Sequence, residues 1–311
     1  MDDLIQRALA GERRAIGRLL TVAERGGEPA TALTTALAGR QHGAHVIGVT
    51  GAPGAGKSTL VAGLVGAMVD RGDRPAVLAV DPSSPLTGGA ILGDRVRMDD
   101  VAGDGSFIRS VATRGHAGGL ALSVPGSVRA FDACGFDPVL IETVGVGQVE
   151  VDVAGAADTT VVVVNPGWGD AVQANKAGLL EVADVFVINK ADRDGASDTR
   201  RDLELMLDLS HVSGHEDDTG YRPPILLTTA TDGSGVEQMW EAVAAHRAHL
   251  ESTGGLARRR AERFRYEVES RVRTRLDEWI TEAADSVEPD GRAPSTVAAE
   301  IASRLGERRS G

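Results

Sequence analysis

Apolar positions follow two different rhythms along this chain, and the first of them is helical. In residues 4–25 the apolar side chains recur at three- and four-residue spacing on one side. These side chains are Leu4, Ala8, Leu9, Ile16, Leu19 and Leu20. The pattern predicts a helix that is broken by the glycines and proline of residues 25–29, followed by a short helix over residues 30–39.

From residue 45 onward, short runs rich in Val, Ile and Leu alternate with stretches of helical periodicity. The runs are apolar almost throughout, as expected for strands buried on both faces of a mostly parallel sheet. They span residues 45–50, 76–82, 106–112, 138–144, 159–165, 185–192 and 225–230. The helical patterns between them span residues 57–70, 118–135, 170–183, 198–210 and 235–250. This alternation predicts a doubly wound α/β domain over residues 44–250, after a helical extension over residues 1–43.

The strand pattern ends near residue 251, and the remaining residues 251–311 are predicted to be a helical arm. Residues 256–283 carry an apolar stripe at four-residue intervals among charged residues, which predicts one long amphipathic helix. The stripe consists of Phe264, Val268, Val272, Leu276 and Ile280. Such a stripe can pack on its own domain or form a subunit contact, and the pattern leaves both possibilities open. A short final helix is predicted over residues 296–305.

Composition and charge exclude several classes of function. The 311 residues are 42% apolar, which favours a folded globular protein. We expect a cytoplasmic protein with no membrane segment, because no uncharged apolar run approaches about 18 residues and the first residues lack a signal-peptide pattern. The net charge of −12 argues against a nucleic-acid partner. Cys134 is the only cysteine, so neither an intramolecular disulfide nor a thiolate zinc cluster can form.

The most specific motif is VTGAPGAGKSTL, residues 49–60, between a predicted strand and a predicted helix. Its spacing satisfies the phosphate-loop pattern, in which backbone N–H groups and a helix N-terminus cradle a polyphosphate. Lys57 is predicted to reach the terminal phosphates, and Ser58 to bind Mg²⁺. The residues predicted to contact the nucleotide here are Gly51, Ala52, Pro53, Gly54, Ala55, Gly56, Lys57, Ser58 and Thr59.

A second motif, NKAD at residues 189–192, predicts which base is bound. It ends a buried strand, where the loops of such sheets meet ligands. The Asp192 carboxylate can accept hydrogen bonds from the ring N–H and the amino group of guanine, whereas adenine offers an acceptor at that ring position. Asn189 and Lys190 are expected to brace the neighbouring loops. The backbone of Thr229, Ala230 and Thr231, after the next strand, is expected to contact the guanine carbonyl.

Groups for Mg²⁺ and the γ-phosphate are predicted between these two motifs. Glu142 stands in the aspartate position of a strand-then-DxxG arrangement, where a carboxylate holds Mg²⁺, and the N–H of Gly145 can contact the γ-phosphate. Asp81 also ends a predicted strand and is therefore expected to point toward the crevice at the strand ends where the nucleotide binds. Gln148 is a candidate for orienting water, and Lys176 is a candidate charge donor.

Several longer motifs carry a resemblance to a known family. They are VDPSSP, TGGAILGDRVRM, RGHAGGLA, IETVGVGQVEVDVAGAADTTVVVV and PGWGDAVQANKAGLLEVADVFVINKAD. With these motifs the chain resembles the ArgK/MeaB family of P-loop GTPases over roughly residues 1–280. The resemblance implies GTP and GDP as ligands, with Ser58, Asp81, Asp94 and Glu142 at the Mg²⁺ site. It also places Lys176 in a switch loop over residues 166–176, where Trp168 replaces a usually small residue.

The resemblance further implies a partner. Members of this family are chaperone GTPases for an adenosylcobalamin-dependent acyl-CoA mutase, usually methylmalonyl-CoA mutase, whose cofactor loading they gate and which they protect. They are homodimers through the C-terminal helical arm. Because no residue directly after the DxxG position orients water, we expect slow intrinsic turnover that a partner accelerates.

Two alternative functions are weighed against this one. A metal-delivery GTPase would collect nickel or zinc through clustered Cys or His, but the seven histidines are scattered, with close pairs such as His42 with His45 and His211 with His215. A nucleotide-dependent kinase would need an acceptor site and a pocket that tolerates adenine, which the NKAD motif opposes.

Overall fold

The computed structural model describes residues 1–81, 105–112, 119–143, 155–167, 181–212, 220–287 and 291–307. The chain forms two compact units, Met1–Arg263 and Phe264–Gly311. The first unit contains the sheet, and the second contains most of the C-terminal helices.

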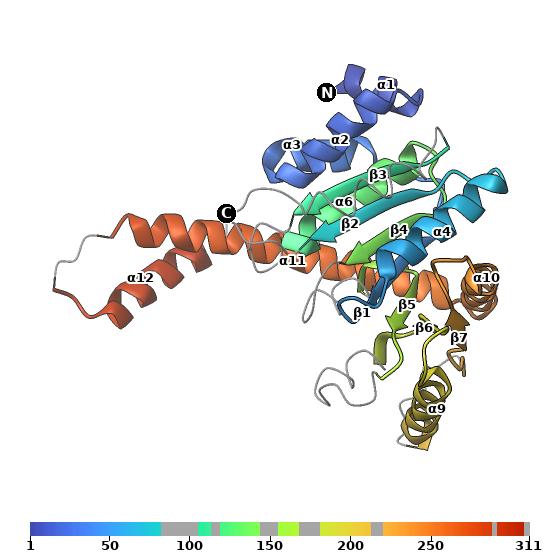
Figure 1. Ribbon diagram of the computed structural model, residues 1–311. Coiled ribbons are helices and arrows are strands. Elements are labelled where there is room, and N and C mark those ends of the chain that lie inside the picture. The colour runs from blue at the N-terminus through green and yellow to red at the C-terminus, as the bar shows by residue number, and fades with distance from the viewer. Residues whose placement is uncertain are drawn as a thin grey trace. The chain divides into compact units, whose positions relative to one another are not determined.

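A seven-stranded sheet with strand order β3-β2-β4-β1-β5-β6-β7 forms the centre of the first unit (Figure 1). All pairings between its neighbouring strands are parallel. The strands are β1 Val46–Gly51, β2 Ala76–Asp81, β3 Phe107–Ala112, β4 Val139–Thr143, β5 Thr159–Val164, β6 Val185–Asn189 and β7 Ile225–Thr228. Each of the seven predicted strands is found, and the doubly wound parallel sheet is confirmed.

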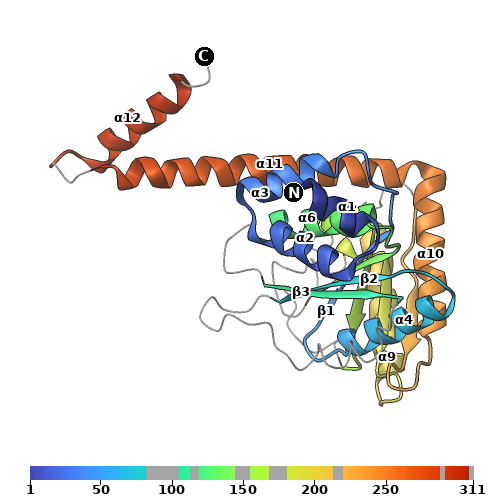
Figure 2. The same ribbon diagram turned by 90° about the horizontal axis from the view of Figure 1, so that it is seen from above.

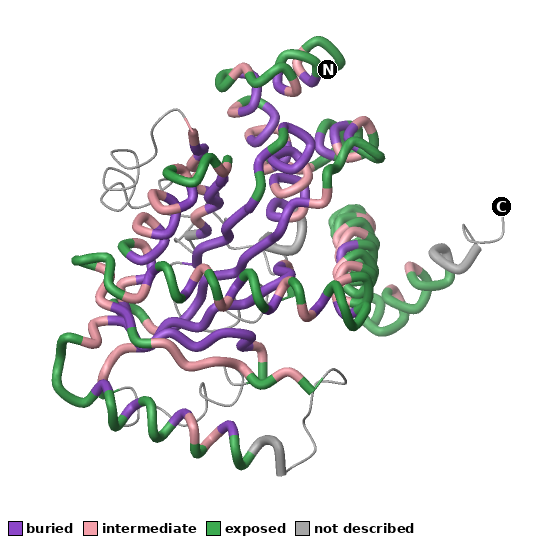
Figure 3. Tube along the Cα trace, turned by 90° about the vertical axis from the view of Figure 1, so that its right-hand side faces the viewer, coloured by how far each residue is buried: buried purple, intermediate pink, exposed green. Residues whose placement is uncertain are grey.

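Helices cover both faces of this sheet. On one face, α4 (Lys57–Asp70) and α10 (Val236–Thr253) pack on Val161 and Val163 of β5. On the opposite face, α9 (Ala196–Val212) packs on Val162 and Val164 of the same strand. The central strands β1, β4, β5 and β6 are buried along their whole length, whereas the edge strand β7 is only partly buried (Figure 3). Burial on both faces explains why these strands are apolar along most of their length.

The N-terminal segment forms α1 (Asp2–Leu9), α2 (Arg13–Arg25) and α3 (Gly27–Ala36). The prediction of one helix over residues 4–25 is wrong, because Gly11 takes a left-handed backbone angle (φ 87°) that ends α1. The predicted break after residue 25 falls at Gly26, between α2 and α3, whereas Pro29 does not interrupt a helix. It lies in the first turn of α3, where the missing N–H would have no partner within the helix.

The N-terminal helices share one core with the sheet. Helix α2 packs on α6 (Gly119–Ala133), which in turn covers β2 and β4 (Figure 2). Phe107 of β3, Phe131 of α6 and Phe136 contact one another edge to face, with ring centroids 5.5–5.9 Å apart. Apolar side chains of α2, including Ile16 and Leu19, complete this cluster. The N-terminal helices are therefore held by the same apolar cluster that supports β2 and β4.

The second unit contains the greater part of α11 (Gly255–Asp285) and α12 (Pro294–Glu307), so both predicted C-terminal helices are found. All five stripe residues of α11 are exposed, from 43% at Val268 and Leu276 to 61% at Phe264. Within the single chain the stripe is therefore not covered. Among the described helices, none is long and apolar enough to cross a membrane.

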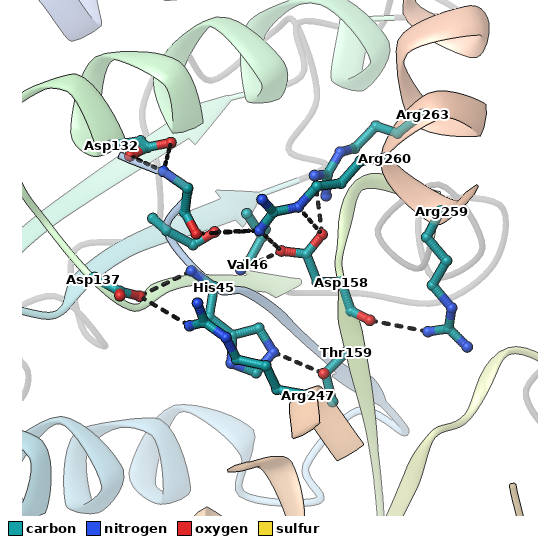
Figure 4. A network of polar contacts seen from close by, with 12 residues as sticks. His45, Val46, Asp132, Asp137, Asp158, Thr159, Arg247, Arg259, Arg260 and Arg263 are labelled. Carbon is teal, nitrogen blue, oxygen red and sulfur yellow. Dashed lines mark hydrogen bonds and ion pairs between the residues drawn. The ribbon is translucent and has the colours of Figure 1, made fainter. Parts of the chain in front are cut away.

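The first residues of α11 are tied to the sheet at the ends of the strands opposite the phosphate loop (Figure 4). The fully buried Asp158, just before β5, receives hydrogen bonds from Arg260 at 2.9 Å and Arg263 at 3.0 Å. The backbone N–H of Val46 donates to the same carboxylate at 3.0 Å. Burial acts to raise the pKa of Asp158, but the hydrogen bond from Arg260 and the charge of Arg263 outweigh it and hold the pKa below its ordinary value.

A chain of buried polar groups lies beside this cluster. The Oγ1 of Thr159 lies 2.8 Å from Nε2 of His45 and 2.9 Å from Nδ1 of His246. Nε2 of His246 lies 3.3 Å from Asp184, which Arg259 binds with both terminal nitrogens at 2.7 Å. Since the hydroxyl has a single proton, at least one of the two histidines must donate to Thr159.

We expect His45 to make stability depend on pH. Burial lowers the pKa of His45 to about 4, although the charge of Asp158 opposes this. In the unfolded chain the imidazole has a pKa of about 6.5. Below that pH the unfolded state binds a proton on His45 that the folded state does not bind, so the free energy of unfolding falls. Between about pH 7 and pH 5 this group should cost about 2 kcal/mol of stability. His45→Gln should remove that part of the pH dependence in chemical denaturation.

The matched control is His42→Gln, since His42 is exposed. It should keep the pH dependence of the wild-type protein. A His45→Gln variant whose stability falls as steeply as the wild type between the two pH values would contradict the assignment.

Candidate nucleotide site

The phosphate loop joins β1 to α4 at the carboxyl edge of the sheet. The strand ends at Gly51, and the helix begins at Lys57. The buried ammonium of Lys57 donates to the carbonyl oxygens of Gly51 at 2.8 Å and Ala52 at 3.0 Å. The phosphate loop thus places the positive charge of Lys57 at the N-terminus of a helix, where backbone N–H groups can also bind an anion.

Asn189, the buried last residue of β6, joins this loop to the loop after β7. Its Nδ2 donates to the carbonyl of Ala55 at 2.7 Å. Its Oδ1 accepts from the backbone N–H of Ala230 at 3.0 Å and from Oγ1 of Thr228 at 3.2 Å. Gly56 permits the Asn189 side chain to lie this close to the phosphate loop, because a Cβ at residue 56 would overlap the Asn189 amide. The first residue of the predicted base-recognition motif therefore connects three loops.

Lys190 and Asp192 follow on the same turn. The Nζ of Lys190 donates to the carbonyl of Gly54 at 2.6 Å, so a second lysine contacts the phosphate loop. The backbone of Lys190 takes a left-handed angle (φ 59°), which costs a non-glycine residue about 1 kcal/mol or more and is concentrated at functional sites. Asp192, two residues further along this turn, is exposed.

Ser58 and Glu142 supply oxygens beside the phosphate loop. The hydroxyl of Ser58 donates to the Glu142 carboxylate, which is 1% exposed at the end of β4. Glu142 pairs in register with Val49 of β1, which brings the two predicted Mg²⁺ ligands together. A hydroxyl and a carboxylate fit the preference of Mg²⁺ for oxygen. No group of three or more His, Cys, Asp or Glu that could hold a metal ion occurs among the described residues.

Five other predicted site residues lie partly or wholly outside the described part of the chain. Asp81 is the last residue of β2, at the same edge of the sheet, but nothing is described of its side chain. Asp94, Gly145, Gln148 and Lys176 lie outside the described residues, as does Trp168.

One pair of residues at this edge was missed by the sequence analysis. The hydroxyl of Thr143 donates to that of Thr50 at 3.2 Å, and both side chains are buried. The pair links the ends of β4 and β1, just before the phosphate loop. Threonine within an apolar strand was the only available signal, and it is too common in strands to be specific.

Comparison with known proteins identifies the family. The model of the family described as "Methylmalonyl Co-A mutase-associated GTPase MeaB" matches residues 16–285. The chain belongs to the MeaB family. Membership in a family of GTPases implies that the protein binds a guanine nucleotide, as the NKAD motif predicts.

Two relatives and one solved structure illustrate the likeness. The chain is 46% identical to a putative GTPase of Pyrococcus horikoshii over 271 residues, which are 87% of this chain and 85% of the relative. It is 37% identical to the GTPase ArgK of Escherichia coli over 257 residues, 81% of this chain and 77% of that one. A crystal structure of a LAO/AO transport system kinase has a TM-score of 0.71 and 26% identity, and the match covers 98% of this chain and 97% of that one.

Proposed function

We propose that this MeaB-family protein binds GTP with Mg²⁺, hydrolyses it slowly to GDP and phosphate, and uses that cycle to regulate a partner enzyme. The proposal rests above all on the joining of three loops by Asn189, which brings a lysine-bearing phosphate loop next to a candidate guanine-selecting aspartate. It places the GTPase domain in residues 44–250 and a helical extension in residues 1–43.

Each residue of the candidate site would have a distinct role in binding or hydrolysing GTP. Lys57 would move from its loop carbonyls to the terminal phosphates and neutralise charge there. Ser58 and Glu142 would hold Mg²⁺, with Asp81 and Asp94 as further candidates, and the bound ion would neutralise charge on the phosphates. Asp192 would accept two hydrogen bonds from guanine, and the backbone of residues 229–231 would donate to its carbonyl. Gly145, Gln148 and Lys176 would respond to the γ-phosphate.

The proposed partner is an adenosylcobalamin-dependent acyl-CoA mutase, with methylmalonyl-CoA mutase as the first candidate. The name of the family supports this choice, since it describes a GTPase associated with that mutase. In the proposed role the GTPase gates cofactor loading and protects the mutase, both in the cytoplasm.

The experiment measures phosphate release from GTP by the purified chain, alone and with methylmalonyl-CoA mutase. We expect turnover alone far below the roughly 10 s⁻¹ of a typical enzyme, and an increase of about 10-fold or more when the mutase orders the switch loops. An equal concentration of an unrelated acidic protein serves as the control. Turnover near that of a typical enzyme that is unchanged by the mutase would contradict the proposal.

We further propose that two copies associate through the arm, residues 251–311. The exposed apolar stripe of α11 supports this, because a charged helix gains stability when such a stripe is covered. A glutamate at the centre of the stripe, Val272→Glu, should convert a dimer into a monomer in analytical ultracentrifugation. Thr281→Glu, nine residues on and therefore on the opposite side of the helix, should leave the dimer intact. If Val272→Glu and Thr281→Glu had the same molecular mass in solution, that result would contradict this interface.

A kinase remains a second candidate, because a solved structure that resembles this chain is described as a transport system kinase. The two functions differ in their nucleotide. Competition between GTP and ATP for the same site distinguishes them, since a site that prefers ATP would favour the kinase.

A further inference from the structure

The loop after β7 is closed at its base by its own backbone. The N–H of Thr229 donates to the carbonyl of Ser234 at 2.9 Å, and the two residues form an isolated bridge. The N–H of Ser234 donates in turn to Oδ1 of Asp232 at 2.8 Å. The position of residues 229–231 therefore depends on how the two ends of this loop meet.

Gly235 lies where these ends meet, as the residue that caps α10. A Cβ at residue 235 would overlap the carbonyl oxygen of Leu227 and lie 3.1 Å from Cα of Thr228. Gly233 has the same left-handed angle, φ 79° in both residues, but no described atom lies within 4 Å of the Cβ it would carry. The two glycines thus share a left-handed backbone conformation, and of the two only Gly235 permits a close approach to β7.

A shift at this point would reach the base-recognition loops. Thr228 accepts from the N–H of Ala191 at 3.0 Å through its carbonyl, and Ala230 donates its N–H to Asn189 at 3.0 Å. Separating residue 235 from residues 227–228 would therefore displace the backbone of residues 229–231 relative to Asn189.

We infer that Gly235 is a positioning residue for guanine selection, which acts by closing the loop so that the backbone N–H of Thr231 is directed at the oxygen on C6 of guanine. The N–H groups of Thr229 and Ala230 donate to Ser234 and Asn189 and hold the loop in place. This inference rests on the proposed function, in which the backbone of residues 229–231 contacts guanine. It deepens that function by assigning part of the base preference to a residue outside the recognition motifs.

The test compares binding of GDP and 6-thio-GDP, because sulfur at C6 accepts hydrogen bonds more weakly and leaves the groups facing Asp192 unchanged. We expect the wild-type protein to prefer GDP by about 10-fold. In Gly235→Ala the affinity for GDP should fall more than that for 6-thio-GDP, so that the ratio approaches one. A merely structural effect would lower both affinities equally and leave the ratio unchanged.

Two further variants keep the test decisive. Gly233→Ala adds the same backbone strain without the overlap and should keep the wild-type ratio. Asp232→Ala, at an exposed position, loosens the same turn and should lower the ratio about two- to threefold. This second variant decides the matter if Gly235→Ala does not fold. A wild-type ratio in both Gly235→Ala and Asp232→Ala would overturn the inference, whereas a wild-type protein that binds neither nucleotide would overturn the proposed function.

Discussion

Replacing Lys57 with alanine should weaken the binding of GDP and GTP by about 10²- to 10⁴-fold. The ammonium is buried against two carbonyls of the phosphate loop, within reach of an anion held by that loop. It would supply two charge-assisted hydrogen bonds to phosphate oxygens, each contributing about 1.5–3 kcal/mol. Fluorescence titration with a labelled guanine nucleotide measures the loss.

The control for this prediction is Arg25→Ala, which also removes one positive charge but lies exposed at the end of α2. It should bind as the wild type does. Thermal denaturation of both variants establishes that they are folded. A folded Lys57→Ala protein that binds within about threefold of the wild type would show that the loop does not hold the phosphates.

Changing Asp192 to asparagine should exchange guanine preference for xanthine preference. A carboxylate accepts from the ring N–H and the amino group of guanine, whereas an amide can accept from the ring N–H of xanthine and donate to its carbonyl at C2. Two such bonds correspond to about 10²- to 10⁴-fold in affinity. GDP binding should therefore fall by that factor, and binding of xanthosine diphosphate should rise by a comparable factor in competition titrations.

Asp194→Asn is the matched control, because Asp194 is also exposed, lies two residues further on, and loses the same charge. Its base preference should stay that of the wild type. An Asp192→Asn protein with unchanged base preference would count directly against guanine recognition by this turn.

The sheet and both nucleotide-binding motifs were predictable because each leaves a local pattern. Strands buried on both faces read as apolar runs, as in the four consecutive valines of residues 161–164, and the phosphate loop has a fixed spacing of glycines and lysine. The order of the strands was not predictable, since pairing between β1 and β4 joins residues more than 90 positions apart. The break between α1 and α2 was missed because the helical periodicity continues across Gly11.

The connections within the site needed the structure. The sequence indicated that Asn189 would brace neighbouring loops, but its contacts with Ala55 and Ala230 depend on the direction of one side chain. Similarly, the sequence predicts a charged amphipathic helix at the start of α11 and assigns no partner to its arginines. In the structure Arg260 and Arg263 bind the buried Asp158 instead. Contacts between distant segments leave no periodic signal in a single sequence.

The most direct test of the account is calorimetric titration of the folded wild-type protein with GDP and with ADP in the presence of Mg²⁺. The account predicts heat of association with GDP at about one nucleotide per chain, and binding of ADP at least about 100-fold weaker. No heat of association with GDP, or equal affinity for the two nucleotides, would contradict the claim that these loops form a guanine-nucleotide site.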